Sequence, residues 1–129
     1  PFMRERGRGY IINVSSVGAF IPRPHLVVYG ATKAFLNHFC LALHDELVGT
    51  GIAVQALCAG YTHTEFHLGL EQGGFSKDQV PAELWMEADA VVAASLAALG
   101  SGRVIVVPGE TNGARARDGC QRQLDALQG

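Results

Sequence analysis

Tyr10-Ile-Ile-Asn-Val-Ser-Ser16 is followed by Tyr29-Gly-Ala-Thr-Lys33, and these two stretches decide how the rest of the chain is interpreted. The first is an apolar run that ends in two hydroxyls, which predicts a strand. The second opens a segment with helical spacing, so the side chains of Tyr29 and Lys33 lie one turn apart on the same face. One carbonyl group could then meet the hydroxyl of Ser16, the phenol of Tyr29 and the ammonium of Lys33.

The pair of Tyr29 and Lys33 suits proton transfer. A nearby ammonium stabilises the phenolate of a tyrosine, so that the phenol can both give and take a proton. With three Tyr and two Lys in 129 residues, such a spacing arises by chance in about one chain in twenty. A surface pair on a solvated helix is the plain alternative, and the motifs around the pair favour the functional interpretation.

A second strand-to-turn element follows in Gly51-Ile-Ala-Val-Gln-Ala-Leu-Cys-Ala-Gly60-Tyr-Thr-His-Thr64. Its apolar run ends at Ala59, and the break at Gly60 delivers polar side chains just past the carboxyl end of the predicted strand. Ligands of open α/β sheets bind at those carboxyl ends. This element therefore predicts part of a binding site.

Asn13-Val-Ser-Ser16, the Tyr-x-x-x-Lys pair and this turn together closely resemble the short-chain dehydrogenase/reductase family, in its single-domain branch. The resemblance implies an oxidoreductase that transfers hydride between NAD(P)(H) and a small-molecule carbonyl or secondary alcohol. It implies that Ser16 holds the substrate oxygen and that Tyr29 is the general acid/base. Lys33 would stabilise the phenolate and bind the nicotinamide ribose.

The resemblance also implies where the cofactor, NAD or NADP, is held. The implied cofactor-binding residues are Tyr29, Lys33, Ala59, Gly60, Tyr61, Thr62 and Thr64. Ala59 stands where the family usually has proline, which would fix the turn at a lower entropic cost. The implied substrate contacts are Ser16, Gly18, Phe66 and Trp85.

The fold expected from the resemblance, which runs from about Gly9 to Gly109, is α/β: a partial Rossmann-type, doubly wound parallel sheet of about three strands with flanking helices. The family's Gly-rich turn, charged selector and Asn-Ala-Gly segment do not occur in the sequence. Residues 1–109 are therefore expected to be the carboxyl-terminal half of an NAD(P)-binding domain, inactive alone, with the amino-terminal half missing. The family's catalytic Asn is expected upstream, since Asn13 and Asn37 do not match it, and the choice between NAD and NADP lies there too.

The periodicity of the apolar residues predicts the strands and helices. The predicted strands span about Tyr10 to Val14, Ile52 to Ala59 and Arg103 to Val107, and the predicted helices about Tyr29 to Val48 and Glu87 to Leu99. Phe35, Phe39, Leu43 and Leu47 recur at helical spacing, which indicates core packing, and the resemblance implies that part of this helix pairs with a second copy in a homo-oligomer.

The remaining segments have less regular patterns. The Gly-containing stretch from Glu65 to Trp85 predicts either a mobile lid over a partly apolar substrate or an ordinary surface connection. The tail 110–129 has little apolar periodicity and is expected to be disordered or at most a short frayed helix.

Composition excludes several classes of function. Ten basic and twelve acidic residues give a net charge of -2, which indicates neither nucleic acid nor an anionic membrane as a partner. The sequence contains no apolar run long enough to cross a bilayer and no signal-peptide core, so a cytoplasmic enzyme is expected. The three cysteines lack C-x-x-C spacing, and His63 and His67 lack a third ligand, so neither a disulfide nor a metal site is expected.

Two other functions remain open from the sequence. An epimerase or dehydratase of the same superfamily reuses the Tyr-x-x-x-Lys pair on nucleotide sugars, although Asn13-Val-Ser-Ser16 and Gly60-x-x-x-Thr64 fit the reductase branch better. A non-catalytic regulatory protein with a Rossmann fold is the other alternative. The intact Ser16, Tyr29 and Lys33 count against it.

Overall fold

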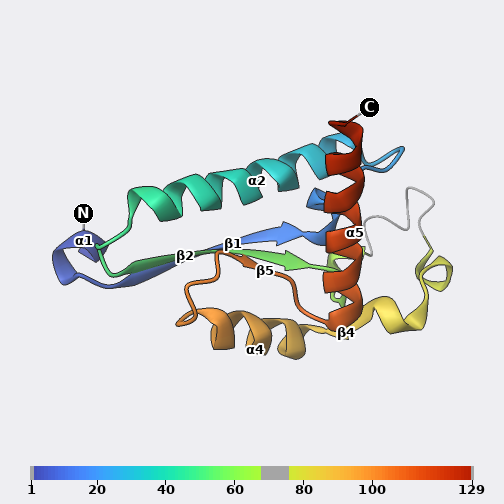
Figure 1. Ribbon diagram of the computed structural model, residues 1–129. Helices are drawn as coiled ribbons and strands as arrows, with labels where there is room; N and C mark the ends of the chain where they lie inside the picture. The colour runs from blue at the N-terminus through green and yellow to red at the C-terminus, as the bar shows by residue number, and fades with distance from the viewer. Residues whose placement is uncertain (1, 68–75, 129) are drawn as a thin grey trace.

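The computed structural model describes residues 2–67 and 76–128 (Figure 1). Within them, a parallel sheet has the strand order β1-β2-β5, with β1 at Gly9–Ser16, β2 at Ile52–Ala59 and β5 at Ile105–Val106. The helices are α1 (Phe2–Arg6), α2 (Val27–Glu46), α4 (Ala88–Ala98) and α5 (Glu110–Ala126). None of these described helices has the length and apolarity that a membrane span requires.

Helices cover both faces of the sheet, α2 on one side and α4 on the other (Figure 1). On the α2 side, Cys40 packs with Val54, Ala56 and Cys58 of β2. On the α4 side, Val91 and Ala98 pack against Leu57 and Val106. This three-layer arrangement of parallel strands confirms the predicted α/β, Rossmann-like fold.

Strand β1 lies at one edge of the sheet formed by the described residues. Its alternate side chains face α2, and those between them, Tyr10, Ile12 and Val14, are exposed. An apolar edge strand of this kind is a template for association with another chain.

Helix α2 begins at Val27, slightly earlier than predicted, and it is rotated relative to the expected apolar stripe. Its buried residues are Asn37 and Cys40, whereas Phe35 and Phe39 are 65% and 43% exposed and stack with their ring centroids 6.1 Å apart. Of the predicted apolar stripe, Leu43 and Leu47 pack in the core, whereas Phe35 and Phe39 lie outside it. The side of the helix that carries Tyr29 and Lys33 packs on β1, and the buried residues Asn37 and Cys40 lie on this side.

The segment predicted as a lid, Glu65 to Trp85, connects two paired strands. Strand β3 (Tyr61–His63) pairs in parallel with β4 (Trp85–Glu87), in the register Tyr61↔Trp85 to His63↔Glu87. Short 3-10 turns lie between them at Glu65–His67, Lys77–Gln79 and Ala82–Leu84. The glycines on which the lid prediction depended, Gly69, Gly73 and Gly74, lie outside the described residues.

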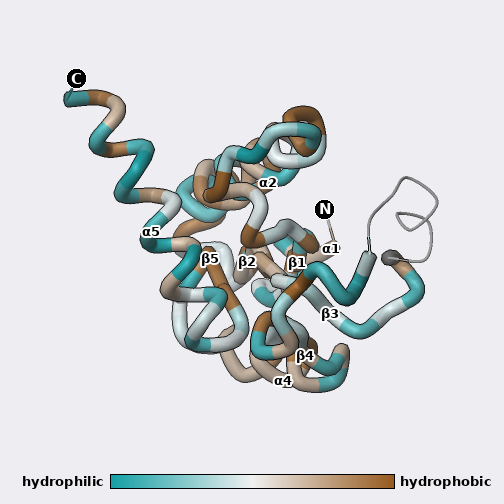
Figure 2. The backbone as a smooth tube through the Cα atoms, turned by 90° about the vertical axis from the view of Figure 1, so that its right-hand side faces the viewer, coloured by the Kyte–Doolittle hydropathy of each residue, from teal (hydrophilic) through white to brown (hydrophobic). Residues whose placement is uncertain are grey.

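The expectation of a disordered tail is wrong, because residues 110–126 form helix α5. Figure 2 shows hydrophilic colours along much of this helix, which explains why its apolar periodicity is so weak. The helix is held by long-range backbone contact: Gly119 lies directly against the carbonyl of Phe20, and Gln123 Nε2 donates to that same oxygen at 2.9 Å. The stabilising partner is thus the loop after β1, about a hundred residues away in the sequence.

The contact between Gly119 and Phe20 gives a test of α5 docking. A Cβ at position 119 would collide with the Phe20 carbonyl, so Gly119→Ala should destabilise the protein by about 1–3 kcal/mol in urea unfolding. Gly113 is the matched control on the same helix, because a Cβ there would lie 3.5 Å from Arg117 Nη1, an ordinary contact. Gly113→Ala should instead stabilise the protein by about 0.5–1 kcal/mol. An equal response of the two variants would contradict the docked helix.

Candidate active site

The hydroxyl of Ser16 and the ring of Tyr29 flank the same glycine. Ser16 is the last residue of β1 and is 9% exposed, and its Oγ accepts a hydrogen bond from Gly18 N at 3.0 Å. A Cβ placed on Gly18 would lie 3.3 Å from both Ser16 Oγ and Tyr29 Cε1. Glycine at this position therefore lets the two side chains approach each other, and the structure brings these two predicted residues together.

Lys33 is held on the same side of α2 as Tyr29. Its Nζ lies 5.7 Å from the centroid of the Tyr29 ring and donates to Val14 O at 2.9 Å. An ammonium has three donors, and this hydrogen bond uses one of them. Lys33 is thus fixed beside the phenol, with capacity to donate to another acceptor.

Helix α2 is joined to β1 by side chains next to the catalytic candidates. Ser15 Oγ donates to the carbonyl of Lys33 at 3.0 Å, and Asn13 Nδ2 donates to Cys40 Sγ at 3.2 Å. Asn37, which the sequence had excluded as the family's catalytic Asn, is 7% exposed and accepts from Cys58 Sγ at 3.2 Å. These polar contacts fix the position of α2 along the sheet. They therefore also fix the positions of Tyr29 and Lys33 relative to Ser16.

The predicted cofactor turn begins beside Ser16, because the strand register pairs Ser16 with Ala59. Gly60 follows at the carboxyl end of β2, and a Cβ there would collide with the side-chain amide of Asn112 from α5. Only glycine permits this close approach. The amide of Asn112 is 2% exposed, and its Oδ1 has no hydrogen-bond partner among the described residues.

The hydroxyls predicted to hold the cofactor bond to their own loop in this structure. Thr62 Oγ1 donates to Gly60 O at 3.2 Å, and Thr64 Oγ1 accepts from Phe66 N at 3.3 Å. Both threonines therefore shape the chain that leaves the turn.

The predicted substrate contacts Phe66 and Trp85 lie in different elements of the structure. Phe66 is 59% exposed in the turn after β3. Trp85 lies in β4, where its ring is 5.4 Å from that of Tyr61 and stacks on His63 at 4.8 Å. These three rings form an aromatic cluster, Tyr61, His63 and Trp85, beyond the carboxyl end of β2.

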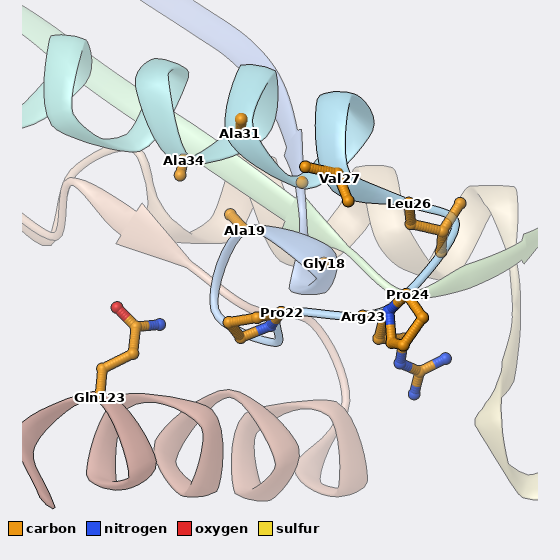
Figure 3. Close-up of a pocket in the computed structure, with 11 residues that line it drawn as sticks. Gly18, Ala19, Pro22, Arg23, Pro24, Leu26, Val27, Ala31, Ala34 and Gln123 are labelled. Carbon is orange, nitrogen blue, oxygen red and sulfur yellow. The ribbon is translucent and has the colours of Figure 1, made fainter. Parts of the chain in front are cut away.

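A groove of about 550 Å³ lies next to Tyr29, between α2, the loop after β1 and α5 (Figure 3). Its lining is mostly apolar, and Gly18, which contacts the Tyr29 ring, forms part of it. Ala31 and Ala34 of α2 face Gln123 of α5 across the groove in Figure 3. Small residues on α2 keep the groove open, and its apolar lining could accept an aliphatic group.

Three residues around the site were not predicted from the sequence: Asn112, Arg23 and Arg115. Asn112 and Arg115 belong to the tail that was expected to be disordered, and Arg23 lies in an irregular loop. The one available hint was Pro22-Arg23-Pro24, in which two prolines fix the backbone around an arginine. Among the described residues, no group of three His, Cys, Asp or Glu side chains is arranged to hold a metal ion.

Comparison with known proteins places the chain in a family. A family model described as "short chain dehydrogenase" matches residues 1–73. The chain is 43% identical over 65 residues to the very-long-chain 3-oxoacyl-CoA reductase of Rattus norvegicus, an alignment that covers 50% of this chain and 21% of that protein. It is 46% identical over 68 residues to the serine 3-dehydrogenase of Rhizobium radiobacter, covering 53% of this chain and 27% of that protein.

Solved structures show the same likeness over nearly the whole chain. A short-chain dehydrogenase from Sphingobium yanoikuyae in complex with NADPH is 33% identical, with a TM-score of 0.74, and the match covers 98% of this chain and 48% of that one. A 7beta-hydroxysteroid dehydrogenase is 27% identical, also with a TM-score of 0.74, over 91% of this chain and 44% of that one. The chain spans less than half the length of each of these four relatives.

Cys58 gives a pH-dependent test of the packing behind the site. Burial raises the pKa of the Cys58 thiol from 9.0 to about 11. The folded state therefore holds this proton more tightly than the unfolded chain does, so the associated stability is complete below pH 9 and is lost as the pH rises through about 11. Urea unfolding between pH 8 and 11 should show a steeper loss of stability for the wild type than for Cys58→Ala. The exposed Cys120 supplies the control, since Cys120→Ala should keep the wild-type slope; a slope unchanged in Cys58→Ala would contradict the burial.

Proposed function

The chain belongs to the short-chain dehydrogenase family, and on that premise we propose that the complete protein is an NAD(P)-dependent oxidoreductase. It transfers hydride between the nicotinamide and a carbonyl or secondary alcohol. The observation that carries the proposal is the meeting of Ser16, Tyr29 and Lys33 at the carboxyl ends of β1 and β2, where open α/β sheets bind ligands. Relatives that match this part of the chain are dehydrogenases and reductases.

Each of the three side chains has one task in this proposal. Ser16 Oγ donates to the substrate oxygen and orients it. Tyr29 gives a proton to that oxygen as a carbonyl is reduced, or takes the proton as an alcohol is oxidised. The Lys33 ammonium, 5.7 Å from the Tyr29 ring, stabilises the negative charge that the phenol develops when it has given up its proton.

The donors in this region fit the nicotinamide half of a dinucleotide. Lys33 retains donor capacity for a ribose hydroxyl, because its hydrogen bond to Val14 O uses one of three donors. The orphaned Asn112 Oδ1 beside Gly60 is an acceptor that an amide donor would satisfy. Bound NAD(P)H supplies the hydride. The relative from Sphingobium yanoikuyae holds NADPH, which supports a nicotinamide cofactor here, as either NAD or NADP.

We also propose that the protein assembles with a second copy through α2. The exposed Phe35 and Phe39 form a stacked apolar pair on the outer side of that helix. A pair of this kind is costly to leave in water, and burying it against its symmetry mate would make a self-complementary contact. Phe35→Glu should then shift the complete protein toward the monomer in sedimentation experiments.

Replacing Tyr29 by Phe tests the proton-transfer step in the complete protein. The substitution removes the transferable proton and keeps the ring, so kcat should fall on the order of 10²–10⁴-fold, with little change in nucleotide affinity. Tyr10, which is 60% exposed on β1, supplies the matched control. Tyr10→Phe should leave kcat unchanged, and a Tyr29→Phe enzyme that turns over at the wild-type rate would sink the assignment.

Lys33→Met tests the two tasks of the lysine separately. Loss of the ammonium should lower kcat, because the phenolate loses its neighbouring charge, and should also weaken nucleotide binding, because a ribose donor is lost. Calorimetric titration with NADH and NADPH measures the second effect without turnover. Normal affinity for both nucleotides would remove the ribose contact from the account.

A further inference from the structure

Two arginines from distant parts of the chain meet at one tyrosine beyond the carboxyl end of β2. Arg23 Nη1 donates to Tyr61 Oη at 3.3 Å. The guanidinium carbon of Arg115, on α5, lies 6.0 Å from the centroid of the same ring. Guanidinium groups stack on aromatic faces and bind carboxylate or phosphate in a bidentate manner.

The two positive charges are not neutralised within the described part of the chain. Neither Arg23 nor Arg115 has an Asp or Glu oxygen within 4.0 Å among residues 2–67 and 76–128, whereas Arg122 on the same α5 is paired with Asp118 at 3.4 Å. Burial lowers the pKa of Arg115, and the charge of Arg23 lowers it further. An anion between them would relieve both effects.

The backbone holds Arg23 in place before any ligand binds. Pro22 and Pro24 restrict the chain on either side of it, and Leu26 N donates to Arg23 O at 3.3 Å. His25 has a φ of 65°, so the segment from Arg23 to Leu26 has the features of a type II turn, with proline second and a left-handed residue third. Non-glycine residues rarely adopt that conformation, and such strain is found preferentially where a site requires it.

The arginine pair adjoins the groove beside Tyr29. Arg23 lines this groove together with Gly18, and Gly18 contacts the ring of Tyr29. Figure 3 shows the Arg23 side chain extending from the loop on the side away from Ala31 and Ala34 of α2. The apolar lining and the Arg23 guanidinium therefore lie on opposite sides of one short loop, and a substrate that reaches both passes over this loop.

We propose that Arg23 and Arg115 form an oxyanion-binding site that holds a carboxylate or phosphate group of the substrate against Tyr61. The apolar part of the same substrate lies in the groove, and its carbonyl reaches Tyr29. This inference rests on the proposed oxidoreductase function and narrows its substrates to amphipathic carbonyl compounds that carry an anionic group. Carboxylates and phosphates share the recognition chemistry, and the experiment separates them.

Trp85 offers a direct readout of anion binding. It is the single tryptophan of the chain and its ring lies 5.4 Å from that of Tyr61. Its fluorescence should change saturably when the complete protein, without nucleotide, is titrated with inorganic phosphate or with hexanoate, at an ionic strength kept constant with chloride. The anion that binds more tightly identifies the group recognised, and saturation by neither overturns the proposal.

Variants show whether the arginines carry this binding. Arg23→Gln and Arg115→Gln should each weaken it about tenfold or more, because each removes a charge-assisted hydrogen bond. Arg117→Gln, on the exposed side of α5, is the matched control and should bind like the wild type. Arg115→Lys keeps the positive charge and serves as the control for loss of folding in Arg115→Gln. Equal binding by the wild type, Arg23→Gln and Arg115→Gln would overturn the proposal.

The outcome can be separated from that of the proposed function. Anion binding requires no turnover, so a Tyr29→Phe protein should retain it. With matched ketones that differ only by a carboxylate, Arg23→Gln should raise the KM of the anionic ketone and leave that of the neutral ketone unchanged. Hydride transfer that persists with equal KM shifts for both ketones would remove the anion site and leave the oxidoreductase proposal standing.

Discussion

The parallel pairing of β1 with β2 is the constraint on which the site depends. Its register runs without interruption from Gly9↔Ile52 to Ser16↔Ala59, so both strands end at the same edge of the sheet. A shift by one residue would turn every side chain of β1 to the opposite face and would take Ser16 away from Tyr29. The hydrogen bonds that Asn13 and Ser15 of β1 make to α2 specify this register, because the alternative would turn both side chains away from that helix.

Helix α5 is the second constraint, and it acts on the loops rather than on the sheet. It touches the chain after β1 at Phe20, through Gly119 and Gln123, and the turn after β2 at Gly60, through Asn112. One polar helix thus holds both loops that leave the carboxyl edge. Its own stability comes from these contacts, since few of its residues are buried.

The predictable elements were those with local signals. Strand β2 and helix α4 came from apolar runs and helical spacing, and the proximity of Tyr29 to Lys33 follows from one helical turn. Elements that depend on distant partners could not be predicted: β3 requires its pairing with β4, and α5 requires the Phe20 carbonyl. Arg115 could not be predicted for the same reason, because only the folded chain brings it to Tyr61.

We propose that this chain carries the proton-transfer half of a hydride-transfer site. The most direct measurement uses NADPH or NADH with deuterium at both C4 positions and follows the label into the product that the complete protein forms from an amphipathic ketone. We expect one deuterium on the new carbinol carbon and a free oxidised nucleotide. A product without deuterium, or no oxidation of either nucleotide, would contradict it.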